Sequence, residues 1–565
     1  MLRTIVLSSL HKVFPQVCPE EAFRQFSCLR NEQVSFQIAY RLEEGKNHPI
    51  FFRVESECPV QAYAVQYVPV VHGDLGSAGD PAKPGLYPDM LIPKTFNGEL
   101  VTVRAGNWGQ YVHEKGEKLR LNAANDSWQS VWFSVNEEGR VLDPGSYRIA
   151  VVFYSGLSGQ EISREEILLQ VEDCVLQPQK LLYTNWVHLD CLADYYQEEL
   201  FSERFWEILE NYLEVAAREG MNLALLPAFT PALDTPVDTC RMPVQLVDIR
   251  QDGGQYAFDF ARMKRYIAIC KKVGITHLEH AHFFSQWGAK ATPAIYARVD
   301  GIEKRIFGWD TPACGDAYRE FLQAYIPALR TFLRQEGMDG NTVYHISDEP
   351  SETMQEDYRK AASIVEPLVE GCILGDALSH YELYEAGAVK TPIVVTDNLD
   401  DFYGKAPGYW CYYTGGQGNP NLSNRLITTE SPLNRILGVQ MYHYGVKGFL
   451  HWGLNFYYDA MSLGMIEPLI NPCGYKNFPG ASFCLYPARD GSAYNAIRYK
   501  VFGEGVRDQR ALEQLEEKRG KDFCEELIRK WFGEMSVHRK PESAEQLLAF
   551  RAEVNRYLSY DGEEG

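Results

Sequence analysis

Thr342-Val-Tyr-His-Ile-Ser-Asp-Glu-Pro350 is the stretch of this 565-residue chain that decides the fold. It begins as a short strand, expected over residues 342–347, and passes through two adjacent carboxylates into an amphipathic stretch over 352–369. A strand that runs directly into a helix is typical of α/β folds with a parallel sheet. Polar residues at the end of such a strand lie where barrel enzymes place their active sites.

The same alternation extends to both sides of this segment. Eight units over roughly 280 residues suit a closed (β/α)8 TIM barrel. An open doubly wound sheet is the rival fold, but no G-x-G-x-x-G follows the first strand and no G-x-x-x-x-G-K-[ST] loop occurs. The strands are expected at 181–189, 222–229, 276–284, 342–347, 372–377, 392–396, 409–414 and 448–454. The clearest helices are expected at 201–218, 258–273, 318–334, 352–369 and 424–444.

The segments that flank the barrel differ from it in character. Residues 1–175 contain short alternating runs and turn residues, which predict a β-sandwich, although a strand-rich extension of the barrel is the alternative. Beyond residue 490, charged helices are expected over 493–502 and 507–533. We therefore expect a multidomain α/β protein with an N-terminal β-sandwich domain (1–175), a (β/α)8 barrel (176–490) and a C-terminal helical extension (491–565).

The composition argues against two classes of binding partner and indicates a cellular location. A net charge of −21 argues against nucleic acid and against an anionic membrane surface, because both require a basic footprint. The 13 cysteines are scattered without a C-x-x-C pair, which favours reduced thiols in a cytoplasmic protein. The apolar run at the N-terminus is too short for a signal peptide, and no stretch approaches the ~20 apolar residues of a membrane span.

Asp348 and Glu349 are the strongest candidates for catalysis. Pro350 is expected to hold Glu349 in an extended backbone state, and Thr353 with Glu356 to form a capping box for the next helix. The alternative is that both carboxylates only cap that helix, whose N-terminus attracts negative charge.

Two adjacent carboxylates suit one kind of glycoside hydrolysis better than others. Direct mechanisms use carboxyls about 5–5.5 Å or 6.5–9.5 Å apart on opposite sides of the sugar, which neighbours in sequence match poorly. They fit a substrate-assisted scheme, in which the 2-acetamido carbonyl of the sugar attacks the anomeric carbon. Glu349 is then predicted to be the general acid and base, and Asp348 to orient the acetamido N–H and stabilise the oxazolinium intermediate.

The segment His345-Ile-Ser-Asp-Glu-Pro350 resembles the H-x-S-D-E-P signature of glycoside hydrolase family 123 and the related uncharacterised barrel family. Weaker similarities lie in Glu32-Gln-Val-Ser-Phe-Gln37, Pro144-Gly-Ser-Tyr-Arg148 and Gly448-Phe-Leu-His-Trp-Gly453, and in Arg498 followed by Glu504-Gly-Val-Arg-Asp508.

The resemblance implies a β-N-acetylgalactosaminidase that uses substrate assistance, with the paired carboxylates of the family at Asp348 and Glu349. The substrate would be a small glycan or glycoconjugate with a terminal β-linked N-acetylhexosamine, and no cofactor is expected. The chain departs from the family pattern at Gln509 and at Asn455-Phe-Tyr-Tyr458. These departures bear on the exact sugar and linkage more than on the mechanism.

Further site residues are predicted from their positions at strand ends. Trp452 is expected to form the floor under the sugar ring, and Asn455 to bond a hydroxyl group. A tyrosine of the seventh strand could bond the acetamido carbonyl, and a buried position in the core is the alternative. The candidates for substrate binding are Trp186, His188, His282, His345, Asp397, Trp410, Tyr412, Tyr413, Trp452 and Asn455.

The third strand allows a second hypothesis. His280 and His282 are spaced to share one face of a strand, as metal ligands do, and His345, His443 or His451 would have to complete a site. We favour hydrogen bonding to sugar or plain packing over a metal-dependent hydrolase, and predict no metal. A non-catalytic carbohydrate-binding protein is the third hypothesis. The sequence leaves the oligomeric state open.

Overall fold

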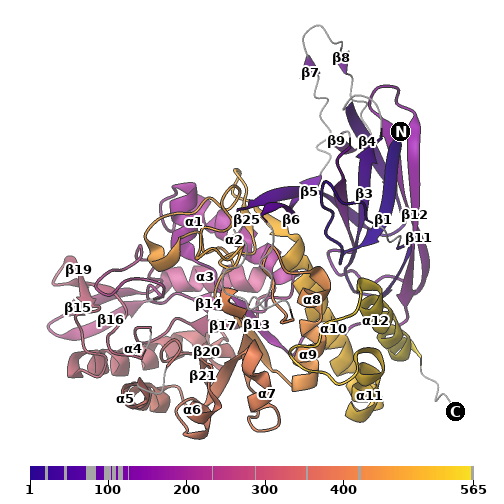
Figure 1. Cartoon of the computed structure of the whole chain (residues 1–565). Helices are drawn as coiled ribbons and strands as arrows, with labels where there is room; N and C mark the ends of the chain where they lie inside the picture. Colours follow the sequence, from indigo (N-terminus) through magenta and orange to yellow (C-terminus); the bar gives the residue numbers. More distant parts are fainter. Residues whose placement is uncertain are drawn as a thin grey trace.

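A closed barrel, a two-sheet unit and a group of helices between them make up the chain (Figure 1). This computed structural model describes residues 1–19, 23–43, 48–71, 84–94, 103–104, 110–111, 119–124, 126–231, 233–286, 288–350, 354–417 and 421–560.

The barrel confirms the predicted (β/α)8 architecture. Eight parallel strands pair in chain order, and the last closes on the first through Leu182 opposite Gly448. Each predicted strand overlaps one observed strand; six of the observed strands are shorter, and β21 and β22 are of the predicted length but shifted by one residue. They are β13 (Leu182–Asn185), β14 (Leu223–Leu226), β17 (His277–His280), β20 (Thr342–Tyr344), β21 (Ile373–Leu378), β22 (Thr391–Val395), β23 (Trp410–Tyr412) and β24 (Gly448–His451).

The strands stay short and apolar because both of their faces are covered. In β14, Leu223 and Leu225 point into the barrel core, while Ala224 and Leu226 pack toward the surrounding helices. The helices between the strands are α1 (Leu189–Tyr196), α2 (Glu203–Arg218), α3 (Ala261–Lys272), α4 (Asp316–Gln335), α5 (Gln355–Val365), α6 (Tyr381–Glu385), α7 (Leu399–Phe402), α8 (Ser431–Arg435) and α9 (Leu437–Tyr444).

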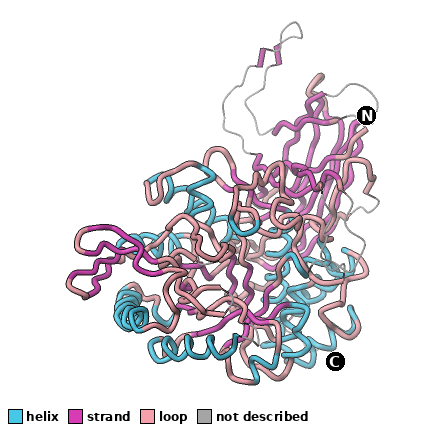
Figure 2. The backbone as a smooth tube through the Cα atoms, turned by 60° about the vertical axis from the view of Figure 1, so that its left-hand side comes forward, coloured by secondary structure: helices cyan, strands magenta, loops and turns pink. Residues whose placement is uncertain are grey.

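A mixed four-stranded sheet is built from insertions in the second and third barrel units. It projects from the side of the barrel (Figures 1 and 2). Its strands are β15 (Asp248–Asp252), β16 (Gln255–Asp259), β18 (Ile295–Val299) and β19 (Ile302–Phe307). The expected helix at 258–273 therefore begins only at Ala261.

The N-terminal region is the predicted β-sandwich. Its two sheets enclose a separate apolar core, in which the rings of Phe36 and Phe133 stack at 4.9 Å. One sheet holds β1 (Leu2–Ser8), β3 (Val34–Leu42), β10 (Gln129–Val135), β5 (Val60–Val70) and β6 (Gly85–Lys94), and the other β2 (Gln25–Leu29), β12 (Glu161–Glu172), β11 (Gly145–Ser155), β4 (His48–Glu55) and β9 (Leu119–Ala123). A further short pair is β7 (Val103–Arg104) with β8 (Gln110–Tyr111).

The chain returns to the sandwich after the barrel. β25 (Tyr486–Pro487) and β26 (Ala493–Ala496) extend the first sheet, with Asn495 opposite Leu91 of β6. The helix expected over 493–502 is therefore wrong in its first four residues. The C-terminal extension then follows as α10 (Ile497–Arg519), α11 (Lys521–Phe532) and α12 (Ala544–Ser559).

Helix α10 is the joint between the two units. Its Phe502 packs 4.8 Å from the ring of Phe449 on the barrel, and its Val501 and Leu512 belong to a cluster with residues of the sandwich. At the crossing with α9, Gly438 lies so close to Gly505 that a β-carbon on Gly438 would meet the Gly505 carbonyl oxygen at 1.8 Å. Buried glycines thus permit the close approach of these two helices.

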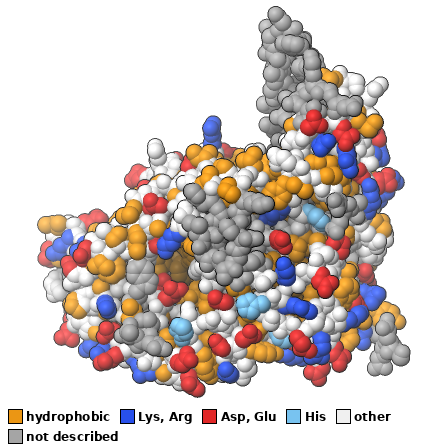
Figure 3. Space-filling model, in the orientation of Figure 1, with side chains coloured by type: hydrophobic (Ala, Val, Ile, Leu, Met, Phe, Trp, Pro, Cys, Tyr) orange, Lys and Arg blue, Asp and Glu red, His pale blue; other side chains and the backbone are white. Residues whose placement is uncertain are grey.

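The surface agrees with the composition. Acidic and basic side chains are interspersed over the described part of the face in Figure 3. All 13 cysteines are present as free thiols. Among the described helices, none has the length and apolar character needed to cross a bilayer.

Candidate active site

A cavity of about 250 Å³ opens at the carboxyl ends of the barrel strands. We call it the barrel cavity. Asp348 and Glu349 both line it, and the mouth of a TIM barrel is where its enzymes carry their chemistry. The other lining residues are Trp186, His188, Leu233, Asp234, Gln286, Ala377, Tyr412, Thr414, Gly415, Gly416, Leu450, Trp452, Phe456, Tyr475, Lys476 and Phe478.

Glu349 has an unusual backbone conformation. Its φ is +44°, in the left-handed region, so the expected extended state before Pro350 is wrong. The side chain is exposed to the cavity and accepts a hydrogen bond of 2.7 Å from the Tyr412 hydroxyl at the end of β23. Ser347 stabilises the turn, because its hydroxyl donates a hydrogen bond of 2.8 Å to the Ser285 carbonyl oxygen. The capping box expected at Thr353 lies outside the described residues.

Asp348 is half-buried beside Glu349. Burial, then the adjacent charge of Glu349 and the charge of Asp376, raise the pKa of Asp348 well above its ordinary value. Two carboxyls this close cannot both ionise at low cost. Asp348 therefore keeps its proton at a higher pH than an isolated aspartate would.

A buried charged triad lies beneath the pair. The His345 ring is placed between Glu279, at 2.8 Å from Nε2, and Asp376, at 3.5 Å from Nδ1, and it also contacts the Gly375 carbonyl. Burial alone would lower the pKa of His345, but the contacts with Asp376 and Glu279 raise it to about 10. We infer that this imidazole is a cation and that it compensates two buried carboxylates.

The carboxylates of the triad are fixed by further donors. Trp186 of the cavity wall donates its indole N–H to Glu279 at 2.8 Å. Asp376 accepts from the Ile346 amide at 3.1 Å and from the Tyr358 hydroxyl. The triad thus connects the wall of the cavity to the strand end that carries Asp348 and Glu349.

His188 is fixed on the opposite wall. Its backbone N–H donates to Asn455 Oδ1 at 2.9 Å, and its Nε2 lies 2.7 Å from the Trp452 carbonyl oxygen. Nδ1 lies 3.0 Å from Arg241, which forms a buried ion pair with Asp190. Burial, then the charge of Arg241, lower the pKa of His188 to about 3, so the ring is neutral and presents a fixed tautomer.

The structure brings together six of the predicted site residues and separates the rest. Asp348, Glu349, Trp186, His188, Tyr412 and Trp452 line the barrel cavity. The others do not line it. His282 and His345 are buried beneath it, Trp410 fills the barrel core, and Tyr413 faces Phe449 and the helical layer. Asn455 binds the His188 backbone, and Asp397 is exposed in the short 3-10 turn before α7.

The expected shared face of His280 and His282 is wrong. His280 points outward, stacks on Phe283 at 4.5 Å and lies 3.0 Å from the Tyr325 hydroxyl, whereas His282 points inward toward His345. β17 ends at His280, so the alternation of faces does not continue. His282, His345 and Asp376 do offer three ligand atoms within 4.8 Å of one another. Nε2 of His345 already contacts Glu279 and its Nδ1 contacts the Gly375 carbonyl, so a metal would have to displace one of these contacts.

Some residues of the site could not be identified from the sequence. Glu279 and Asp376 lie inside strands, where the alternating pattern predicts only that they face inward. Asp234, Tyr475 and Lys476 come from long loops without regular elements. Asp234 accepts from the Met461 amide at 3.0 Å and from the Tyr475 hydroxyl at 3.2 Å.

Comparison with known proteins supports an assignment. The family model described as the glycoside hydrolase 123 catalytic domain matches residues 186–515. No curated protein matches the chain. A family 123 glycoside hydrolase from Clostridium perfringens, described as acting in glycolipid glycan hydrolysis, has a similar structure, with a TM-score of 0.68, 15% identity and coverage of 99% of this chain and 97% of that one.

Two further solved structures are more distant. The β-glucuronidase of Parabacteroides merdae has a TM-score of 0.30 and 10% identity over 88% of this chain and 54% of its own. A β-glucuronidase of Bacteroides uniformis has a TM-score of 0.28 and 9% identity over 87% of this chain and 50% of its own. The family match covers more than half of the chain and includes the cavity residues from Trp186 to Phe478. The chain therefore belongs to glycoside hydrolase family 123 and is a glycoside hydrolase.

Proposed function

We propose that this glycosidase is a retaining β-N-acetylhexosaminidase, exo-acting on terminal β-linked N-acetylgalactosamine, in which the 2-acetamido group of the substrate is the nucleophile. One observation carries the proposal. Asp348 and Glu349 are adjacent in the chain and line the same small cavity. Neighbouring carboxylates cannot approach a sugar from opposite faces, so a substrate nucleophile fits better than a protein one.

The proposed roles follow from the different surroundings of the two groups. Glu349 is exposed to the cavity and acts as the general acid and then the general base at the glycosidic oxygen. Asp348 is half-buried and accepts a hydrogen bond from the acetamido N–H. A donor at Asp348 favours its charged form, so the acetamido N–H of a bound substrate would help Asp348 to ionise.

The size and the walls of the barrel cavity support an exo-acting enzyme. A volume of about 250 Å³ suits a single terminal sugar, and Trp186, Trp452 and Tyr412 provide aromatic surface for its apolar face. Tyr412 lies within the cavity and is the proposed donor to the acetamido carbonyl, which requires its hydroxyl to turn from Glu349 when the substrate binds. Galactosamine is preferred here over glucosamine from the family resemblance alone.

A panel of aryl glycosides tests the proposal. We expect cleavage of aryl β-N-acetylgalactosaminide, slower or no cleavage of the glucosaminide, and none of the β-galactoside, because only acetamido sugars contain the nucleophile. A thiazoline analogue of the oxazoline should inhibit competitively. Proton NMR of the first product should show the β-anomer. A glycolipid glycan that ends in β-N-acetylgalactosamine should be added as the larger substrate, given the description of the Clostridium perfringens enzyme.

Asp234 is the matched control for the alternative outcome. It is the third carboxylate among the described lining residues and is therefore the remaining candidate for the base of an inverting mechanism. If the first product is the α-anomer and Asp234→Asn abolishes turnover, substrate assistance is wrong. Cleavage of the β-galactoside at a comparable rate would contradict it as well.

A further inference from the structure

A second and larger cavity lies where the sandwich meets the C-terminal helices. Its volume is about 660 Å³, and it is lined by residues from β2, β3 and β12 on one side and from α10, α11 and α12 on the other. We call it the helix–sandwich cavity. None of its lining residues belongs to the barrel cavity, so the two are separate. Cavities of about 300–1,000 Å³ are typical of small-molecule sites, and two or three linked sugar rings fall within that range.

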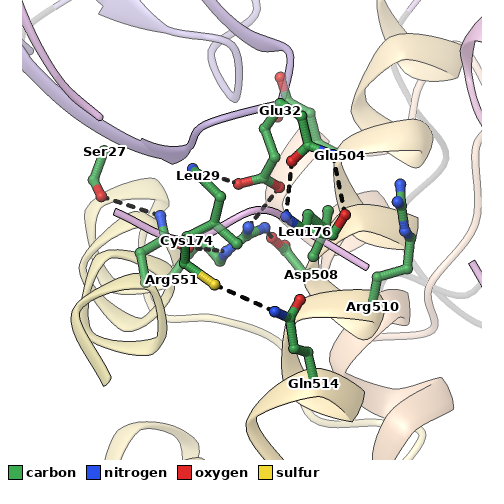
Figure 4. A network of polar contacts seen from close by, with 12 residues as sticks. Ser27, Leu29, Glu32, Cys174, Leu176, Glu504, Asp508, Arg510, Gln514 and Arg551 are labelled. Carbon is green, nitrogen blue, oxygen red and sulfur yellow. Dashed lines mark hydrogen bonds and ion pairs between the residues drawn. The ribbon is translucent and has the colours of Figure 1, made fainter. Parts of the chain in front are cut away.

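Most charged groups of this cavity are already paired with other charged groups. Arg551 binds Glu32 at 2.5 Å and Asp508 at 2.7 Å (Figure 4). Arg435 binds Glu504 at 2.8 Å. The cavity therefore has no large excess charge with which to recognise an ion. An ionic ligand would have to break buried ion pairs, which is costly.

Several buried polar atoms at this cavity have no hydrogen-bond partner among the described residues. Both side-chain atoms of the Gln33 amide and the Ser35 hydroxyl have no hydrogen bond within the described part of the chain, although these residues are only 6% and 5% exposed. The same holds for one nitrogen of Arg507 and for one oxygen of Glu504, at 8% and 5% exposure. Buried polar atoms are nearly always satisfied, so such a cluster along one cavity indicates a missing partner.

The unpartnered atoms define the chemistry of that partner. The Gln33 amide offers two donors and one acceptor, Ser35 both donates and accepts, Arg507 donates and Glu504 accepts. Hydroxyl groups that donate and accept at once match this mixed set. Apolar side chains at the same cavity, among them Phe23 and Trp531, suit the apolar face of a sugar ring.

We propose that the helix–sandwich cavity is a binding site for an uncharged oligosaccharide of two or three units. The site is separate from the barrel cavity and does not depend on the proposed reaction. A glycan held there would keep a polymeric or branched substrate on the enzyme while its end is processed elsewhere.

Calorimetric titration tests the site with lactose, cellobiose and maltotriose. These probes lack an acetamido group, and the Asp348→Asn variant serves as background, so that turnover cannot interfere. We expect one probe to bind with a stoichiometry of one. Its affinity should fall about tenfold in Gln33→Leu, which removes the hydrogen bonds, and in Trp531→Ala, which removes the apolar surface. Gln160→Leu, at an exposed position on the β11–β12 turn, is the matched control and should bind as the parent does.

Three outcomes would overturn the proposal. They are no binding of any probe at millimolar concentration, equal affinity in Gln33→Leu and the parent, and tighter binding of sialyllactose than of lactose, since the last would show an anion site. If thermal unfolding shows that Gln33→Leu is not folded, the Ser35→Ala variant tests the site instead, because it deletes one hydroxyl and leaves the ion pairs intact. A titration unaffected by Ser35→Ala would then reject the site.

Discussion

Glu349 occupies a backbone conformation that its own side chain and the following proline both disfavour. A non-glycine residue at φ +44° costs on the order of 1–3 kcal/mol and persists where the surroundings enforce it. Here the Ser347–Ser285 bond below the turn and the Tyr412–Glu349 bond above it supply that enforcement. Stored strain at a carboxylate in a cavity is typical of a functional position.

The two carboxylates should respond differently to amide substitution. Glu349→Gln is expected to lower kcat by about 10²–10⁴ for poor leaving groups and by much less for dinitrophenyl glycosides, which need no acid. Asp348→Asn should lower kcat by orders of magnitude for both, because it fails to orient the acetamido group. Steady-state kinetics on nitrophenyl and dinitrophenyl β-N-acetylgalactosaminides measure the difference.

Thermal unfolding provides the control for these variants. Asp348→Asn removes a carboxyl whose pKa is raised in the folded state. Such a group destabilises the protein increasingly as the pH rises above the ordinary carboxyl pKa, so the variant should be at least as stable as the parent at pH about 7. A loss of both activity and folding in either variant would show that the effect on kcat is structural.

His345 should make stability depend on alkaline pH. Its folded pKa of about 10 lies above the ordinary value of 6.5, so its contribution is complete below pH 6.5 and is lost as the pH rises through about 10. His345→Gln leaves Glu279 and Asp376 uncompensated and should cost about 3–5 kcal/mol of the free energy of unfolding near neutral pH. Urea unfolding near neutral and alkaline pH measures both effects.

His443→Gln is the comparison for this experiment. It breaks a less buried ion pair of 2.7 Å with Glu525, for which about 1 kcal/mol or less is expected. If the two variants lose the same stability, or if His345→Gln retains the alkaline decline of the parent, the cationic imidazole is wrong.

At the residue scale, the sequence predicts functional side chains at the ends of strands and misses those inside strands. Asp348, Glu349 and Trp452 are identified because polar or aromatic residues at strand ends stand out against an apolar pattern. Tyr413 is one position off the inward register of Tyr412, whereas Trp410 shares that register but lies deeper, in the barrel core. The alternation of side chains along a strand does not by itself predict which set of residues faces the barrel interior, nor how deep in the barrel each residue lies.

The order of elements in the barrel was predictable because strands and helices alternate in hydrophobic period. The ends of the elements were not, because tertiary contacts set them. Strand β16, inserted in the second unit, shortens the expected helix at 258–273 at its start. The expected helix at 424–444 is two helices, α8 and α9. Residues 493–496 directly precede helix α10 in the sequence, but they form a strand because they pair with β6.

The crossing of α9 and α10 depends on a glycine pair. Gly438→Ala would place a β-carbon 1.8 Å from the Gly505 carbonyl oxygen, so the helices must move apart. We expect a loss of about 1–3 kcal/mol in the free energy of unfolding, measured by urea denaturation. Gly340→Ala, where nothing lies within 4 Å of the new β-carbon, should be close to neutral. Equal stability of Gly438→Ala and the parent would show that the helices adapt without cost.

The whole molecule is held together by its C-terminal segment. We propose residues 1–175, 176–490 and 491–565 as its domains, with the last acting as the connection between the other two. Phe502 of α10 packs on Tyr183 at 5.0 Å and on Phe449 at 4.8 Å, both of which belong to barrel strands. The barrel therefore shares its apolar outer layer with a helix that comes after it in sequence.

A chain truncated after residue 490 should not form a stable barrel. The truncation removes β26 and α10–α12 and exposes the aromatic surface around Tyr183 and Phe449. We expect aggregation on expression, measured by size-exclusion chromatography, whereas a chain that ends at Tyr560 keeps all three helices and should remain monodisperse. A folded, cooperative 1–490 fragment would contradict the connecting role.

The strand that β6 requires as its neighbour, β26, is separated from it in the chain by the entire barrel. During synthesis β6 leaves the ribosome long before β26 has been translated. The backbone amides at this edge of the nascent sandwich therefore remain unpaired until translation is nearly complete. Vectorial folding from the N-terminus is thereby interrupted, and the first sheet to be translated is among the last to be finished.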